Sequence, residues 1–184
     1  DLMISGAVPP ETSNPEKNPD FDMIDAQLTT EIFGFFSPAR PDFAVEMAEL
    51  PIQTTARFNA EWISKFYVSM YSMAANADPN QTTKENLINF AEKSRALLPD
   101  DSYSAKMYDF VKKQYYEDIP WETIRDNVYQ RYQVEQKDGY DLTSRNMRCN
   151  ACAAAGINFA ASIISLFAGE GDLKETIKIG SLSG

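Results

Sequence analysis

The sequence contains no histidine, and it has only two cysteines among its 184 residues. The missing imidazole excludes a Ser-His-Asp triad and a His-ligated zinc site within the chain. No βαβ pattern surrounds Cys149 and Cys152, so two buried thiols or a local disulfide are favoured over a thioredoxin-like redox motif. Any chemistry carried by these residues must therefore use carboxylates, hydroxyls, amides or a metal ion.

Basic residues are also scarce, with 17 lysines and arginines against 27 aspartates and glutamates and a formal charge of −10. This deficit disfavours a nucleic-acid partner, because such binding depends on neutralising phosphates. No signal-peptide pattern heads the chain. A leader removed before Asp1 stays an alternative, and a cytoplasmic and a secreted location are left equally open.

A long uncharged run extends from Ala151 to Ala168, and about 18 apolar residues is the lower limit for crossing a bilayer. We reject a membrane span because Asn158, Ser162 and Ser165 recur at helical spacing and small side chains dilute the hydrophobicity. The run instead predicts a helix at the centre of a bundle, where neighbours approach closely. A membrane-associated helical protein remains the alternative, and it would require this run to face lipid.

Helical periodicity covers most of the remaining sequence, and no segment gives a convincing period-two strand. The spacing predicts an apolar core stripe made of Phe58, Trp62, Phe66, Met70 and Met73. Capping patterns predict helix starts at Thr82, Ser102 and Asp172, and Pro120 is expected as a first helical residue.

We therefore predict one all-α domain over residues 1–184, which is long enough to bury a proper core. Residues 1–22 carry several prolines among polar residues and are expected to form an extended coil. Residues 136–148 are polar and contain glycine, which predicts a loop long enough to be functional. Residues 169–172 are expected to turn the chain into a final amphipathic helix.

The most informative pattern begins at Ile24 with the sequence IDAQLTTEIFG, which is followed by SPARPD. Further segments follow in order: AELPIQTTA at 48–56, the aromatic helix from Phe58, LPDDS at 98–102, Trp121-Glu122, Asn150, and residues 166–184. Together these segments resemble the middle portion of the ADP-ribosylglycohydrolase family. The resemblance covers nearly the whole chain.

This resemblance implies an orthogonal multi-helix bundle that hydrolyses an N- or O-glycosidic bond to ADP-ribose, or to a related nucleoside conjugate, with two magnesium ions. Two metal ions can hold ribose hydroxyls and a water molecule against an oxocarbenium-like centre without histidine. In the family the metal ligands come from an acidic N-terminal motif and a Gly-Asp-Thr-Asp-type C-terminal loop, and neither is present here. The magnesium ligands, and a further polypeptide of the same enzyme as partner, are therefore expected outside this chain.

The resemblance also implies candidate substrate-binding residues, although no catalytic residue is assigned. Asp25 and Gln27 are expected to face an ADP-ribose-type substrate, with the Thr29 and Thr30 hydroxyls nearby. At Asp25 to Gln27 many relatives carry an Asn-Gly and Met-Arg pattern. Because the polar groups differ here, the resemblance does not determine the identity of the substrate. The alternative is a helix cap at Asp25 with a solvated Gln27.

Glu11 and Ser13 lie in a coil that borders the ligand cleft in relatives, and the alternative is a disordered polar segment. The side-chain amide of Asn150 is expected to be buried and to need a hydrogen-bond partner. We expect that partner to be a substrate or the backbone of a metal loop. The competing function is a catalytically inactive helical relative that binds a nucleotide or a protein.

Overall fold

The computed structural model describes residues 2–140 and 153–183, and within these ranges the chain forms helices and no strand. The only extended pairing among them is an isolated antiparallel bridge between Met23 and Ala154. The predicted all-α class is therefore confirmed. Cys149, Asn150 and Cys152 lie outside the described residues, so the expectations placed on them stay predictions.

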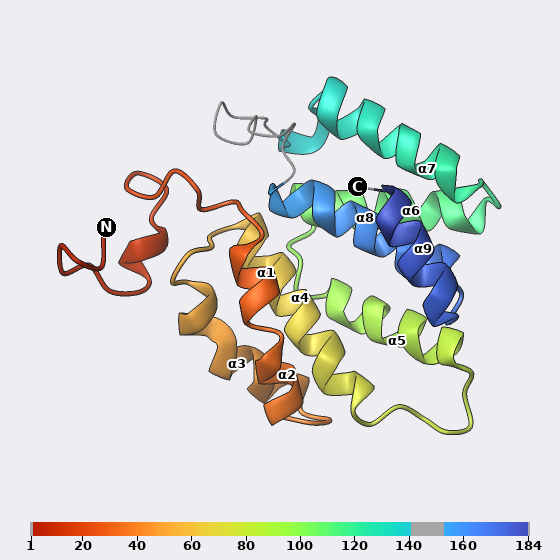
Figure 1. The fold of residues 1–184 in the computed structure, drawn as a ribbon, viewed down its shortest axis with the longest axis horizontal. Coiled ribbons are helices and arrows are strands. Elements are labelled where there is room, and N and C mark those ends of the chain that lie inside the picture. Colours follow the sequence, from red (N-terminus) through yellow and green to blue (C-terminus); the bar gives the residue numbers. More distant parts are fainter. Residues whose placement is uncertain (1, 141–152, 184) are drawn as a thin grey trace.

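The N-terminal half forms one short 3-10 turn, Glu11–Ser13, and then four α-helices (Figure 1). These are α1 (Asp25–Thr29), α2 (Ile32–Phe36), α3 (Pro41–Ile52) and α4 (Asn59–Ala74). Helices α2 and α3 both pack on α4. A side chain at Gly34 of α2 would place its Cβ only 2.6 Å from the Val68 carbonyl oxygen, so the close approach of α2 to α4 requires glycine.

The next three helices are α5 (Thr83–Arg95), α6 (Tyr103–Tyr116) and α7 (Trp121–Val128). The predicted capping box is present, because Thr82 Oγ1 accepts from the Glu85 N–H at 3.2 Å and the Glu85 carboxylate accepts from the Thr82 N–H at 2.7 Å. Ser102 caps α6 as predicted. Pro120 is the N-cap of α7 rather than its first residue, one position from the expectation.

A π-helical turn, Tyr129–Val134, and a 3-10 turn, Lys137–Gly139, follow α7. The chain ends in α8 (Ala155–Ala168) and α9 (Leu173–Ser183), which pack against each other. Gly171 has a φ of +83° in the turn between them, and Asp172 Oδ1 accepts from the Glu175 N–H at 2.9 Å, as its predicted cap requires. Among the described residues no helix is long and apolar enough to cross a membrane.

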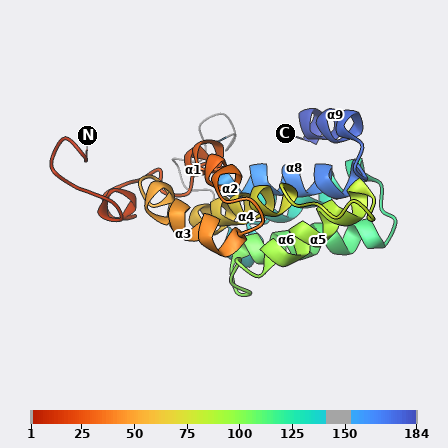
Figure 2. The same cartoon turned by 90° about the horizontal axis from the view of Figure 1, so that it is seen from below.

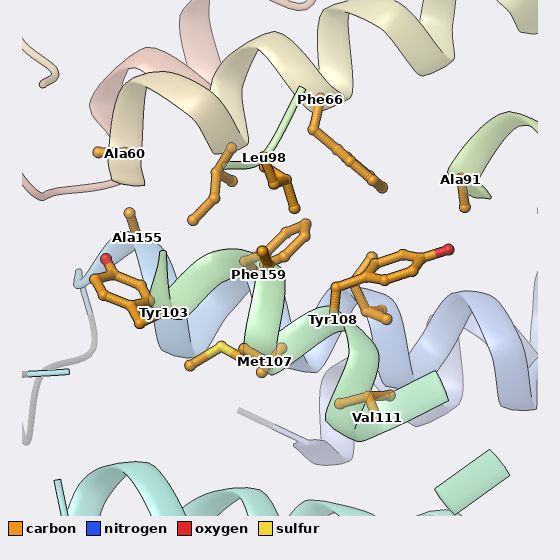
Figure 3. Close-up of a cluster of buried hydrophobic side chains, with 14 of the residues drawn as sticks. Ala60, Phe66, Ala91, Leu98, Tyr103, Met107, Tyr108, Val111, Ala155 and Phe159 are labelled. Carbon is orange, nitrogen blue, oxygen red and sulfur yellow. The ribbon is translucent and has the colours of Figure 1, made fainter. Parts of the chain in front are cut away.

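The core lies where α4, α6 and α8 meet (Figure 3). Phe159 of α8 meets Phe66 of α4 edge-to-face, with ring centroids 5.1 Å apart, and both side chains are fully buried. Tyr108 of α6 closes the cluster, with its ring centroid 5.9 Å from that of Phe66. The uncharged helix therefore occupies the centre of the bundle. Helices α1 and α9 lie apart from each other but on the same side of the α4–α8 layer (Figure 2).

Candidate functional site

A cavity of about 430 Å³ lies between α1 and α9, over α4 and α8. We call it the α1–α9 cleft. Its polar groups include Gln27, Glu31, Tyr67, Tyr71, Ser162 and Thr176. These side chains come from both halves of the chain, so the cleft exists only in the folded bundle.

Gln27 is the group in this cleft that most needs a partner. Its side chain is only 5% exposed, and its Nε2 forms no hydrogen bond within the described residues. A buried donor without an acceptor costs about 1–3 kcal/mol. The alternative of a solvated Gln27 is therefore wrong, and an acceptor supplied by a ligand would relieve the cost.

Hydroxyl groups form the floor of the cleft. The Tyr67 hydroxyl shares a hydrogen bond with the Ser162 hydroxyl, which donates to the Asn158 carbonyl oxygen at 3.0 Å. Thr176 Oγ1 donates to the Asp172 carbonyl oxygen at 2.8 Å. Burial raises the pKa of Tyr67, so its phenol stays neutral. Because the serine and threonine protons point into their own helices, these oxygens retain lone pairs that can accept.

Glu31 contributes the carboxylate of the cleft and lies between α1 and α2. It accepts a hydrogen bond from the Tyr71 hydroxyl of α4. Partial burial raises the pKa of Glu31, and the Tyr71 hydrogen bond opposes that rise. The cleft thus combines the amides of Gln27 and Asn158, several hydroxyl oxygens and one paired carboxylate.

This set of groups suits a neutral polyol, whose hydroxyls donate and accept in turn. It does not fit two magnesium ions, which favour several carboxylate or carbonyl oxygens and bound waters. In residues 2–140 and 153–183, no group of three or more aspartates, glutamates or cysteines is placed to hold a metal ion. The lining of the cleft therefore resembles a sugar-binding surface more than a two-metal centre.

The other residues predicted on α1 do not reach the cleft lining. Asp25 is exposed and makes no side-chain capping bond, since Ile24 holds the N-cap position. The hydroxyls of Thr29 and Thr30 donate to the carbonyl oxygens of Asp25 and Ala26, at 2.8 and 2.6 Å. Only Gln27 of these four residues lines the cavity.

Glu11 and Ser13 lie elsewhere. Ser13 is buried and its Oγ donates to the Pro10 carbonyl oxygen at 2.9 Å. Glu11 pairs with Lys17 and lines a separate cavity of about 380 Å³ beside Arg57. The structure therefore does not bring these two residues into the α1–α9 cleft, and it places them in a 3-10 turn rather than in a purely extended coil.

A further cavity of about 440 Å³ was not indicated by the sequence patterns. It opens where α4 and α6 begin, and its lining includes Phe21, Asp22, Phe58, Trp62 and Tyr103. We call it the aromatic–acid cavity. Phe58 was expected in the core stripe, but it is 52% exposed, so that prediction is wrong for this residue.

Asp22 is the notable acid of this second cavity. Burial raises its pKa to about 6, although hydrogen bonds from the Tyr103 hydroxyl and the Ala60 N–H oppose the rise. A perturbed carboxyl group beside a cavity marks a candidate site. The sequence signal that could have found it is a phenylalanine and an aspartate directly after a proline-rich coil.

Comparison of the chain with protein-family models, curated proteins and solved structures finds no match. The function must therefore be argued from the two cavities and from the sequence resemblance.

Proposed function

We propose that this chain forms the ribose-binding wall of a magnesium-dependent hydrolase of the ADP-ribosylglycohydrolase type. The substrate would carry an N- or O-glycosidic bond to ADP-ribose or to a related nucleoside conjugate. Two features support the proposal: the family-like segments occur in order along the chain, and the chain is all-helical. The observation that carries it is Gln27, which lines a cleft of hydroxyl groups and whose buried Nε2 has no partner in the described residues.

In this proposal Gln27 donates to a ribose hydroxyl, and the hydroxyl oxygens of Ser162 and Thr176 accept from neighbouring sugar hydroxyls. The contacts of Ser162 and Thr176 would replace hydrogen bonds to water and so mainly orient the sugar, whereas the contact of Gln27 would also satisfy a buried donor that has no partner in the described residues. Positioning a sugar for attack is a large part of glycosidase catalysis. The two magnesium ions implied by the resemblance would need ligands other than the described residues.

Calorimetry with ADP-ribose tests the proposal, with ADP as the comparison because it lacks the terminal ribose. We expect ADP-ribose to bind at least about tenfold more tightly than ADP, which corresponds to about 1.4 kcal/mol. The variant Gln27→Met keeps the length of the side chain but removes the donor, and it should abolish most of that preference. Equal affinities for the two nucleotides would contradict a ribose site in the α1–α9 cleft.

A hydrolysis assay with and without magnesium separates the enzyme from its alternative. Release of free ADP-ribose from an ADP-ribosylated substrate, dependent on magnesium and catalysed by this chain together with the polypeptide that supplies the metal ligands, would support the hydrolase. Tight ADP-ribose binding with no magnesium effect and no turnover would instead support a catalytically inactive nucleotide-binding relative. Both hypotheses predict that ADP-ribose binds, but only the hydrolase predicts turnover. The assay therefore distinguishes the two.

A further inference from the structure

The aromatic–acid cavity has a corner of aromatic rings at its mouth. The rings of Phe21 and Phe58 meet at 87° with centroids 6.1 Å apart, and those of Phe58 and Trp62 meet at 63° with centroids 6.4 Å apart. Rings at such steep angles offer walls in different planes rather than one stack. A compact rounded group can touch more than one ring in this corner.

Phe58 is the central ring of this corner, and both its exposure and its backbone conformation are unusual. Its side chain is 52% exposed, and its backbone φ is +50°, a region that bulky residues rarely adopt. Burial of the Phe58 ring therefore does not account for its position. The ring lines this cavity and also the smaller one beside Glu11.

The charge of the cavity is negative. Asp22, Asp101 and Asp138 line it, and no lysine or arginine is found among the described residues of its lining. Asp138 forms an ion pair with Arg131, at 2.9 Å between Arg131 Nη2 and Asp138 Oδ2. Asp22 lies next to the rings, so the cavity presents aromatic faces and an anionic group together. That combination attracts organic cations.

The hydrogen bonds that Asp22 already accepts limit which kind of cation can bind beside it. Its two carboxylate oxygens accept from the Tyr103 hydroxyl, at 3.0 and 2.8 Å, and the carboxylate also accepts from the Ala60 N–H. A guanidinium group would need both oxygens for its planar fork, and a primary ammonium would need several acceptors for its N–H groups. A quaternary ammonium needs none, because it responds to charge and ring faces alone.

We propose that the aromatic–acid cavity binds an organic cation with a quaternary ammonium head group. The methyl groups would lie in the corner formed by Phe21, Phe58 and Trp62, with the Asp22 carboxylate as counter-ion. This site is independent of the ribose site proposed for the α1–α9 cleft.

Fluorescence titration tests the site. The chain has two tryptophans, so the variant Trp121→Phe leaves Trp62 as the only reporter. Choline is the probe, and 3,3-dimethyl-1-butanol is its neutral isostere at the same ionic strength. Choline should bind at least about tenfold more tightly than the isostere, because only the cation gains from the ring faces and the carboxylate.

Two further variants locate the interaction. Asp22→Asn removes the charge but keeps an oxygen for the Tyr103 hydroxyl, and it should reduce the preference for choline over its isostere to the part that the ring faces contribute. Phe58→Leu should weaken choline binding by about tenfold. Phe36→Leu is the matched control, since Phe36 is also exposed, at 66%, and does not line the cavity.

Three results would overturn the proposal. The first is an isostere that binds as well as choline, and the second is methylguanidinium binding more tightly than choline. The third is a Trp62 signal that does not saturate with choline up to about 50 mM, which is beyond any specific site. A circular-dichroism spectrum of each variant confirms that a lost signal does not reflect a lost fold.

Discussion

The α1–α9 cleft and the aromatic–acid cavity have nearly equal volumes, about 430 and 440 Å³, but opposite chemistry. In the cleft, the buried Gln27 Nε2 is a donor without a partner. In the aromatic–acid cavity, the oxygens of Asp22 already accept hydrogen bonds from Tyr103 and Ala60. We therefore expect the first site to select a neutral ligand by hydrogen bonds, and the second to select its ligand by charge and shape.

Helix α4 supports both cavities. Trp62 in its first half lines the aromatic–acid cavity, and Tyr67 and Tyr71 in its second half line the cleft. Between them Phe66 is buried in the core against Phe159 of α8. Damage to this core contact should thus affect both sites, whereas changes within either cavity should separate them.

The largest effect is expected from Phe159→Ala. Removing a fully buried ring leaves a cavity among Phe66, Tyr67 and their neighbours, and such truncations cost about 3–5 kcal/mol. Denaturant unfolding should show the midpoint fall, with ligand binding weakened at both sites. Phe36→Ala is the control, because this exposed ring should cost less than about 1 kcal/mol. A loss below about 1 kcal/mol for Phe159→Ala would contradict the central role of α8.

The next largest effect is the pH dependence of the folding stability that Asp22 causes. Its pKa rises on folding from 3.8 to about 6, so the folded state holds the proton more tightly than the unfolded state does. The resulting stability is fully present below pH 3.8 and is lost as the pH rises through about 6. Two units of pKa correspond to at most about 3 kcal/mol, and because Asp22 is only half-buried we expect about 1–2 kcal/mol.

Unfolding curves of the wild type and of Asp22→Asn at pH 4 and pH 7 measure this difference. The variant should gain stability relative to the wild type as the pH rises, since it has no carboxylate to desolvate. Parallel pH profiles for the two proteins would show that Asp22 is not desolvated in the folded chain. The cleft should be insensitive to this substitution, because Asp22 does not line it.

A third prediction concerns Gln27→Met, which should separate stability from binding. Replacing an unpartnered buried amide by an apolar side chain of similar length should stabilise the free protein by about 1 kcal/mol. The same change should weaken ADP-ribose binding. Asp25→Asn on the same helix is the matched control, since Asp25 is exposed and should change neither property. A destabilised Gln27→Met variant would mean that the amide already has a partner.

Features that depend on neighbours in sequence were predictable. The helix caps at Thr82 and Asp172 follow from a glutamate three residues later, and the cap at Ser102 follows from a run of capping residues before an apolar stripe; all three are present. The uncharged run correctly indicated a central helix, although α8 begins only at Ala155, after Ala153 and Ala154, which are described but not helical. These features need no knowledge of which helices meet.

Features that depend on tertiary contacts were not predictable. Gln27 was chosen from the sequence, but Glu31, Tyr67 and Ser162 join it in the cleft only because α2, α4 and α8 converge there. Helical periodicity also placed Phe58 in the core stripe. It could not reveal that Phe58 precedes α4 with a φ of +50° and turns outward.

The smallest effect is expected at the turn that holds α9 against the bundle. Glu170 accepts from Lys84 Nζ at 2.7 Å and from the Tyr115 hydroxyl at 2.8 Å, which ties the α8–α9 turn to α5 and α6. Because these side chains are largely exposed, Glu170→Gln should cost less than about 1 kcal/mol, and the cost should shrink in high salt.

The same substitution sharpens the comparison of the two cavities. Thr176 of α9 lines the cleft, whereas no residue of α9 is among the described residues that line the aromatic–acid cavity. Glu170→Gln should therefore weaken ADP-ribose binding slightly, by about twofold, and leave choline binding unchanged. Titration of the variant with both ligands makes the measurement. An equal loss at both cavities would mean that the turn stabilises the whole bundle and that α9 has no separate role in the cleft.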